Sequence, residues 1–171
     1  MVPGDAMRSS EHGFTLVELL VVIAIIGILA GITAHHVLAA KAAANEASAV
    51  GTLRAVHSGQ VAYSMTCAPS AYSTSLAQLV SARFVSPDVA LASKDGYTFN
   101  LTNTLGVAGP TDCNGNASST AYYLSATPVS NLTGIRAFAT NQFGGIWQDT
   151  SGVPPAEPFV AGGTVSPLQG R

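Results

Sequence analysis

The sequence predicts an α+β protein in which a long N-terminal helix packs on a small antiparallel β-sheet of three or four strands. Three observations lead to this class. Residues 16–34 are almost entirely apolar, residues 35–64 keep a helical pattern without proline, and the later segments are short and rich in aromatic and β-branched residues. The 171 residues leave room for one ordinary domain and an appended segment.

The apolar block reads LVELLVVIAIIGILAGITA and predicts a transmembrane segment over residues 16–34. Its roughly 19 residues span about 30 Å as a helix, which is the thickness of the hydrocarbon core of a bilayer. A cleaved secretory signal is the alternative, since Arg8 precedes the block and small residues follow at 38–40. The block is longer than the usual apolar region of such signals and carries Glu18 near its start, so we favour the membrane-spanning helix.

The helical pattern continues beyond the apolar block. Alanine is abundant, and Val50, Leu53, Val56 and Val61 form an apolar stripe at helical spacing. We expect one helix over residues 14–64, roughly 75 Å long at the standard rise. Half of it extends beyond the bilayer, and only the rest of the chain is available to cover its stripe.

Residues 65–171 are expected to form a β-rich globular head with an irregular tail. A short helix is predicted over 75–85, stopped by Pro87. Strands are predicted over residues 97–102, 121–127, 135–140 and 146–148. The Pro- and Gly-rich tail from Val153 is expected to be irregular or mobile.

Composition argues against several functional classes. The formal net charge is -2 and only 9% of residues are charged. The chain therefore lacks the excess of basic residues that attracts nucleic-acid phosphates, and no specific nucleic-acid partner is predicted. The adjacent His35 and His36 point about 100° apart on a helix and cannot chelate one ion as an i, i+4 pair would. Asp95, Asp112 and Asp149 match no compact calcium loop. No G-x-S-x-G elbow is present, and we expect neither an enzyme nor a metal or other cofactor.

The two cysteines, Cys67 and Cys113, both follow the apolar block. If that block spans a membrane, both face an oxidising compartment, which makes them a candidate disulfide. Two free buried thiols are the alternative.

The start of the apolar block carries the most informative motif. Residues 13–20 read GFTLVELL, and this segment resembles the N-terminal signal of type IV pilins and type II secretion pseudopilins through Gly13, Phe14, Thr15, Leu16 and Glu18. The likeness is dense over about 20 residues and looser in the head, and it implies a pilin-like fold.

The resemblance implies that residues 1–13 are a leader, removed by a prepilin peptidase between Gly13 and Phe14, and that the new Phe14 amine is N-methylated. A glycine leaves the backbone at this bond open to a protease. Glu18 lies one helical turn from Phe14, and a carboxylate in a spanning helix normally needs a partner. The partner implied is the Phe14 amine of a neighbouring subunit. The alternative is a carboxylate that only reaches back to the membrane interface.

The chain also departs from the family. Where many main pilins bend at a proline, this sequence has His35, so Gly27 and Gly31 are its only weak points in the spanning segment. Glu11 and His12 occupy the place beside the cut where a basic residue is common, which leaves recognition more dependent on Arg8.

The function predicted is therefore a structural subunit of a type IV pilus-like filament, homo-oligomeric or mixed. Its partners would be the prepilin peptidase and methyltransferase, the inner-membrane assembly machinery and, before assembly, the lipid bilayer. It would be a single-pass inner-membrane protein that moves into an extracellular pilus or a periplasmic pseudopilus. The alternatives are a pseudopilin of type II secretion and a membrane-anchored protein that never polymerises. Either Met1 or Met7 serves as the start.

Overall fold

The computed structural model describes residues 13–91 and 93–168, apart from the side chains of residues 33–35. The predictions made for Arg8, Glu11, His12, the His35 side chain and the start of the chain lie outside the described residues. The chain divides into two units, residues 1–37 and 38–171. One helix, α1 (Leu16–Thr66), contributes residues to both units.

In the first unit, α1 begins at Leu16 and every described side chain from residue 13 to residue 32 is exposed. Apolar residues lie on all sides of this part of the helix, which is typical of a helix whose surroundings are lipid or other helices. Among the described residues α1 is long and apolar enough to cross a membrane.

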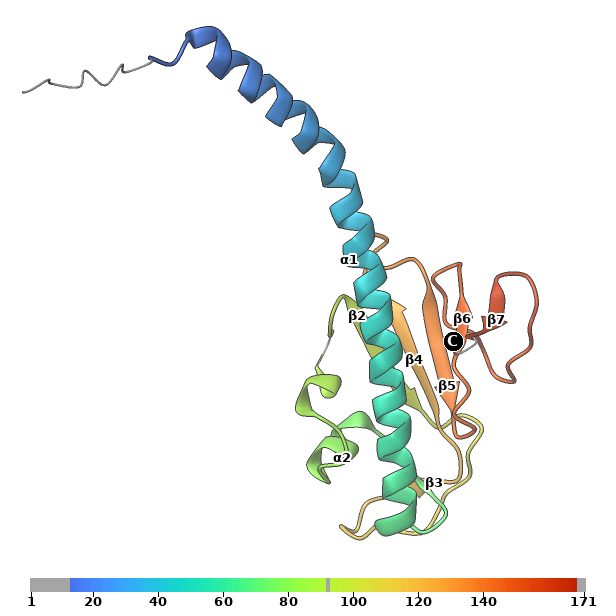
Figure 1. The fold of residues 1–171 in the computed structure, drawn as a ribbon. Helices are drawn as coiled ribbons and strands as arrows, with labels where there is room; N and C mark the ends of the chain where they lie inside the picture. Colours follow the sequence, from blue (N-terminus) through green and yellow to red (C-terminus); the bar gives the residue numbers. More distant parts are fainter. Residues whose placement is uncertain (1–12, 92, 169–171) are drawn as a thin grey trace, which may run out of the picture. The chain divides into compact units, whose positions relative to one another are not determined.

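In the second unit, α1 lies across one face of a five-stranded antiparallel sheet (Figure 1). The strands are ordered β2-β4-β5-β6-β7, and a separate two-stranded sheet pairs β1 with β3. The elements that follow α1 are β1 (Tyr72–Ser73), α2 (Leu76–Ser81), the 3-10 helix η1 (Pro87–Ala90), β2 (Tyr97–Thr102), β3 (Ser118–Ser119), β4 (Tyr123–Pro128), β5 (Ala137–Asn141), β6 (Trp147–Asp149) and β7 (Val165–Pro167).

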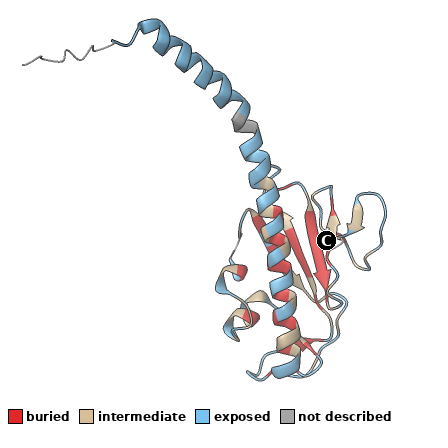
Figure 2. Cartoon of the chain, viewed as in Figure 1, coloured by how far each residue is buried: buried red, intermediate tan, exposed pale blue. Residues whose placement is uncertain are grey.

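The core lies between the helix and the sheet. Buried positions of α1 are red in Figure 2. Of the predicted apolar stripe, Leu53 and Val56 are fully buried and Val50 is partly buried. It packs with the large core side chains of the strands, which include Tyr97, Phe99, Leu124 and Phe138. The predicted pilin-like α+β architecture, a long helix packed on an antiparallel sheet, is confirmed.

Gly59 lies on a buried side of α1 and allows the segment around Val85 to approach the helix backbone closely. A Cβ at this position would lie 2.6 Å from the Val85 side chain and 3.0 Å from the Phe84 carbonyl oxygen. The segment that follows α2 therefore lies directly against the backbone of α1.

The sheet is larger than predicted. It has five strands rather than three or four, because β7 in the C-terminal tail pairs with β6 through Trp147–Pro167, Gln148–Ser166 and Asp149–Val165. Pro167 is tolerated because β7 is an edge strand, where a missing N–H leaves no ladder bond unmade. The tail was expected to be irregular or mobile. Part of it is a strand.

The predicted helix over 75–85 is shorter in the structure. α2 covers six residues, starting after Ser75, whose side chain accepts a hydrogen bond from Gln78 N at 3.2 Å. The chain leaves the helix at Arg83, which has a φ of 62°, and η1 follows.

Candidate functional site

Thr15 and Glu18 form a reciprocal hydrogen-bonded pair at the start of α1. The Thr15 N–H and hydroxyl donate to Glu18 Oε2 at 3.1 and 2.7 Å, and Glu18 N donates to Thr15 Oγ1 at 3.2 Å. This is a capping box, in which a Ser or Thr before the helix and a Glu three residues later satisfy backbone N–H groups that the helix leaves unpaired.

The capping box gives Glu18 a role within a single chain. A carboxylate in the first turn also interacts favourably with the positive end of the helix dipole. Thr15 is the residue whose role in this site the sequence reasoning missed, although its signal, Thr15-Leu16-Val17-Glu18, is readable in the sequence.

Gly13 and Phe14 precede this helix start and are both exposed, Phe14 with 78% of its surface accessible. A Cβ placed on Gly13 would meet nothing within 4 Å. The fold itself therefore does not require glycine at this position. The bond between the two residues lies just outside the helix, where its backbone is open to an enzyme.

Gly27 and Gly31 are likewise not required by packing within the chain. A Cβ at either position would meet nothing within 4 Å. Each glycine lowers the stability of the helix by about 1 kcal/mol relative to alanine. Because glycine has no side chain, each also leaves the helix backbone open to close contact with a neighbouring group.

Comparison with protein families identifies this segment. Residues 8–34 match the prokaryotic N-terminal methylation motif. This prepilin-type motif includes Gly13, Phe14, Thr15 and Glu18 and is consistent with the type IV pilin and pseudopilin family. No curated protein and no solved structure matches the chain significantly.

The prepilin-type motif together with the pilin-like fold makes this chain a prepilin-type substrate. Processing by a prepilin peptidase and filament assembly are what the motif implies, and membrane anchoring through the apolar helix before assembly agrees with it. Proteins of this kind are generally structural subunits without enzymatic activity.

Outside the prepilin-type motif, the two cysteines meet where α1 ends. Cys67 and Cys113 form a disulfide bond with their Cα atoms 4.7 Å apart, and Cys113 N donates to Cys67 O at 2.8 Å. The bond ties the loop before β3 to the end of the long helix.

Asp112, beside this disulfide, is surrounded by donors. Its Oδ1 accepts from the backbone N–H groups of Asn114 at 2.9 Å and Asn116 at 2.6 Å. Its Oδ2 accepts from the Tyr63 hydroxyl at 2.7 Å, Gln78 Nε2 at 3.0 Å and Asn116 Nδ2 at 3.2 Å. Both oxygens are therefore engaged by protein donors, which identifies Asp112 as a structural carboxylate. Asp95 and Asp149 are not brought together with it, and no group of three or more potential metal ligands occurs in the described part of the chain.

Proposed function

We propose that this chain is a structural subunit of a type IV pilus-like filament. Prepilin peptidase cuts between Gly13 and Phe14, the Phe14 amine is N-methylated, and the mature helix packs with copies of itself or with related subunits. The observation that supports this most directly is the match of residues 8–34 to the prepilin-type motif on a helix whose apolar surface is exposed on all sides. Such a surface needs lipid before assembly and other helices afterwards.

Cleavage places a new positive charge next to the capping box. The Phe14 amine precedes Thr15 directly, and Glu18 is the acidic residue in the first turn of α1. In an apolar filament core, an amine and a carboxylate from neighbouring helices staggered by about one turn would neutralise each other. Glu18 would then serve first as a helix cap in the membrane and afterwards as the charge that sets the stagger between subunits.

Two substitutions separate these roles of Glu18. Glu18→Gln removes the charge but keeps a side chain that is competent in a capping box. Thr15→Ala removes the cap and leaves the charge. We expect Glu18→Gln to be cleaved normally yet to be absent from filaments, and Thr15→Ala to assemble with at most a modest loss. Equal assembly of wild type and Glu18→Gln would contradict the charge-pairing mechanism.

The first test is mass spectrometry of the N-terminal peptide from sheared surface fibres and from the membrane fraction. A mature chain that begins with methylated Phe14 in the sheared material is the expected result. Gly13→Val is expected to block cleavage without affecting the head, because no part of the described structure contacts a side chain at position 13. Mature chain confined to membranes, with loss of exoprotein release on deletion, would point to the pseudopilin. An uncut Gly13–Phe14 bond would overturn both, and leave a membrane-anchored protein that does not polymerise.

A further inference from the structure

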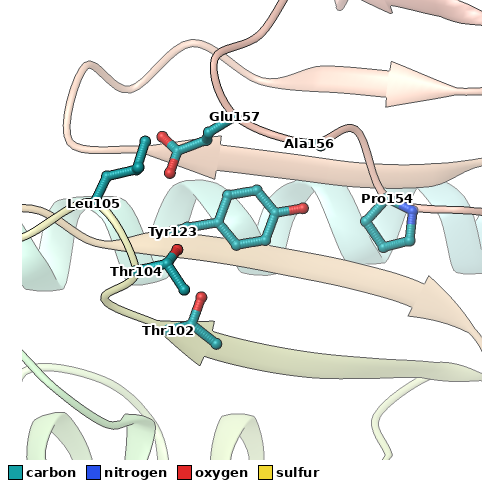
Figure 3. Close-up of a pocket in the computed structure, with 7 residues that line it drawn as sticks. All are labelled: Thr102, Thr104, Leu105, Tyr123, Pro154, Ala156 and Glu157. Atoms are coloured by element: carbon teal, nitrogen blue, oxygen red, sulfur yellow. The ribbon is translucent and has the colours of Figure 1, made fainter.

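Two adjacent cavities lie on the head, and Leu105 and Glu157 line both of them. Their volumes are about 440 and 350 Å³, which is the size range of sites for small molecules or single side chains. Figure 3 shows the first cavity, with the Tyr123 ring at its centre, Glu157 and Leu105 on one side, and Thr102 and Thr104 on another.

The register of the sheet explains why these residues meet. Tyr123 in β4 pairs with Asn141 in β5 and with Thr102 in β2. Side chains alternate along each strand, and Leu124 and Phe138 belong to the core packed against α1. Tyr123 and Asn141 therefore point to the other face, away from α1.

The C-terminal segment completes the cavities on this face. The Tyr123 hydroxyl donates to Pro155 O at 2.7 Å, and Asn141 Nδ2 donates to Glu157 Oε1 at 2.6 Å. Both bonds fix residues 155–157 against the sheet. The site therefore consists of residues from the strands and the loops beside them, covered by a segment that lies more than 30 positions from Tyr123 in the sequence.

Aromatic rings line both cavities, Tyr123 the first, and Trp147 and Phe159 the second. Phe159 stacks on Trp147 with ring centroids 5.5 Å apart and an interplanar angle of 21°, and it lies 6.1 Å from the ring of Tyr123. Phe143 also lines the second cavity and is 84% exposed. The faces of such rings carry negative potential and attract cations.

Glu157 supplies the charge of the site. Its carboxylate is oriented by Asn141, which is 7% exposed, yet no ion pair to Glu157 occurs within the described ranges. Burial and the nearby charge of Glu157 raise the pKa of Tyr123 to about 12. Gln142 lines the second cavity, and its buried Oε1 has no hydrogen-bond partner among the residues that the structure describes. Among the described residues, the Gln142 side-chain oxygen therefore lacks a hydrogen-bond donor, and the Glu157 carboxylate lacks a positively charged partner.

We propose that these cavities bind an organic cation, an ammonium or guanidinium group carried on an apolar stem, as in the side chains of lysine and arginine. Glu157 would pair with the charge, and the rings of Tyr123, Trp147 and Phe159 would cover the stem. A hard metal ion fits poorly, because calcium takes six to eight oxygen ligands and this site presents a single carboxylate against aromatic walls. The inference concerns the head and does not depend on filament assembly.

Trp147 gives a direct readout, since it is the chain's single tryptophan. The full-length protein in non-ionic detergent is titrated with N-acetyl-lysine methylamide and N-acetyl-arginine methylamide, and Trp147 fluorescence is followed. The neutral analogue N-acetyl-norleucine methylamide and glucose serve as comparison ligands. We expect a saturable change with the two cations and none with the neutral ligands. No saturable change with either cation, an equal response to norleucine, or a response to glucose alone would overturn the proposal.

Three variants test the residues. Glu157→Gln keeps the shape of the side chain and the acceptor for Asn141, and it should weaken cation binding about tenfold. Tyr123→Leu removes a ring from the wall and should weaken it several-fold. Asp95→Asn is the matched control: it removes one carboxylate outside the cavities, at a residue with a φ of 49° that asparagine tolerates, and should leave binding unchanged. Equal binding by wild type and Glu157→Gln would contradict the assignment.

The same titration on sheared fibres distinguishes two sources of the cation. A response in both detergent-solubilised protein and fibres indicates a free ligand. A response in solubilised protein alone indicates that a lysine or arginine of a neighbouring subunit fills the site in the filament. If solubilised protein fails to respond, the proposed site is wrong whatever the outcome for filament assembly.

Discussion

Asp112 makes stability depend on pH in the acid range. Burial raises the pKa of its carboxyl group, but hydrogen bonds from Gln78, Tyr63 and Asn116 outweigh this effect and hold the pKa well below its usual value. Because the folded state favours the charged form, the stabilisation is complete above the ordinary aspartate pKa of about 3.9 and is lost as the pH falls below it. Urea unfolding of the wild type and of Asp112→Asn between pH 7 and pH 2 checks this. The acid-induced loss below pH 4 should be smaller in the variant, and identical slopes would contradict the assignment.

His57 predicts a second pH dependence nearer to neutrality. It lies on α1, and its Nδ1 is 2.6 Å from the Tyr122 hydroxyl oxygen, within hydrogen-bond distance. Burial lowers the pKa of His57, so the folded state favours the uncharged form. The stability from this site is full above the ordinary histidine pKa of about 6.5 and declines as the pH falls through it. We expect the free energy of unfolding to decrease between pH 7 and pH 5 in the wild type and to stay nearly level in His57→Gln.

The C-terminal end of α2 carries a side chain in an unfavourable backbone conformation. Arg83 has a φ of 62°, and the N–H groups of Arg83 and Phe84 donate to Val80 O and Leu79 O, both at 3.0 Å. This is a Schellman motif, in which glycine is the usual residue at the left-handed position. Arg83→Gly should stabilise the head by about 0.5–1 kcal/mol, as measured by the urea midpoint. Arg83→Ala, which keeps the strain and removes the charge, is the control and should give no gain.

A carboxylate on α1 holds the connection between β4 and β5. Glu46 Oε1 accepts from the N–H groups of Ile135 at 2.9 Å and Arg136 at 3.1 Å, and Oε2 pairs with the Arg136 guanidinium at 2.6 Å. Glu46 is 8% exposed, whereas the Arg136 side chain is 39% exposed, so the carboxylate is shielded from water and the guanidinium only partly so. We expect Glu46→Gln to lower the free energy of unfolding by about 1 kcal/mol, because it removes the charge of a buried carboxylate from its hydrogen bonds and from a partly exposed arginine.

A double-mutant cycle isolates the pair from the two backbone bonds. If Arg136→Met and Glu46→Gln each destabilise the head, the double variant should cost less than their sum. Strict additivity would show that the ion pair itself contributes nothing and that the backbone bonds carry the effect.

The disulfide acts on the stability of the head as a whole. Cys67 and Cys113 are separated by 46 residues, and closing a loop of this length stabilises the folded state by about 4 kcal/mol in the chain-entropy model. We expect the double variant Cys67→Ala, Cys113→Ala to lose a large part of this, measured by urea unfolding of the oxidised wild type and the variant. If a reductant lowers the free energy of unfolding of the wild type by the same amount as the double substitution, the stabilisation comes from the disulfide bond and not from the packing of the sulfur atoms.

The long apolar helix and its prepilin-type motif could be predicted because they depend on local patterns. Nineteen or so apolar residues, a proline-free continuation and the Gly13–Phe14–Glu18 spacing are all read along the chain, and no distant contact is needed to specify them. All four predicted strands overlap strands of the sheet by more than half their length, and the helix predicted over 14–64 ends within two residues of the end of α1. Hydrophobic periodicity decides these elements because each has one buried face.

Other features depend on contacts between residues far apart in the sequence. β1 and β3 are two residues long, too short to show a period, and they exist because Tyr72 and Ser73 pair with Ser119 and Ser118. β7 reads as a Pro- and Gly-rich tail, and only its pairing with β6 makes it a strand. The buried polar residues Glu46 and Gln60 likewise become favourable only when their partners arrive from β-strands or loops.

The two parts of this protein therefore differ in what specifies them. The apolar helix and the prepilin-type motif lie within one contiguous stretch of sequence, so both could be recognised from that stretch alone. The cavity around Glu157 combines strand register with a C-terminal segment that crosses the sheet, and register and crossing are tertiary properties. No local sequence pattern predicts that Tyr123, Trp147 and Phe159 are neighbours, because aromatic residues in strands and loops are equally typical of an ordinary hydrophobic core.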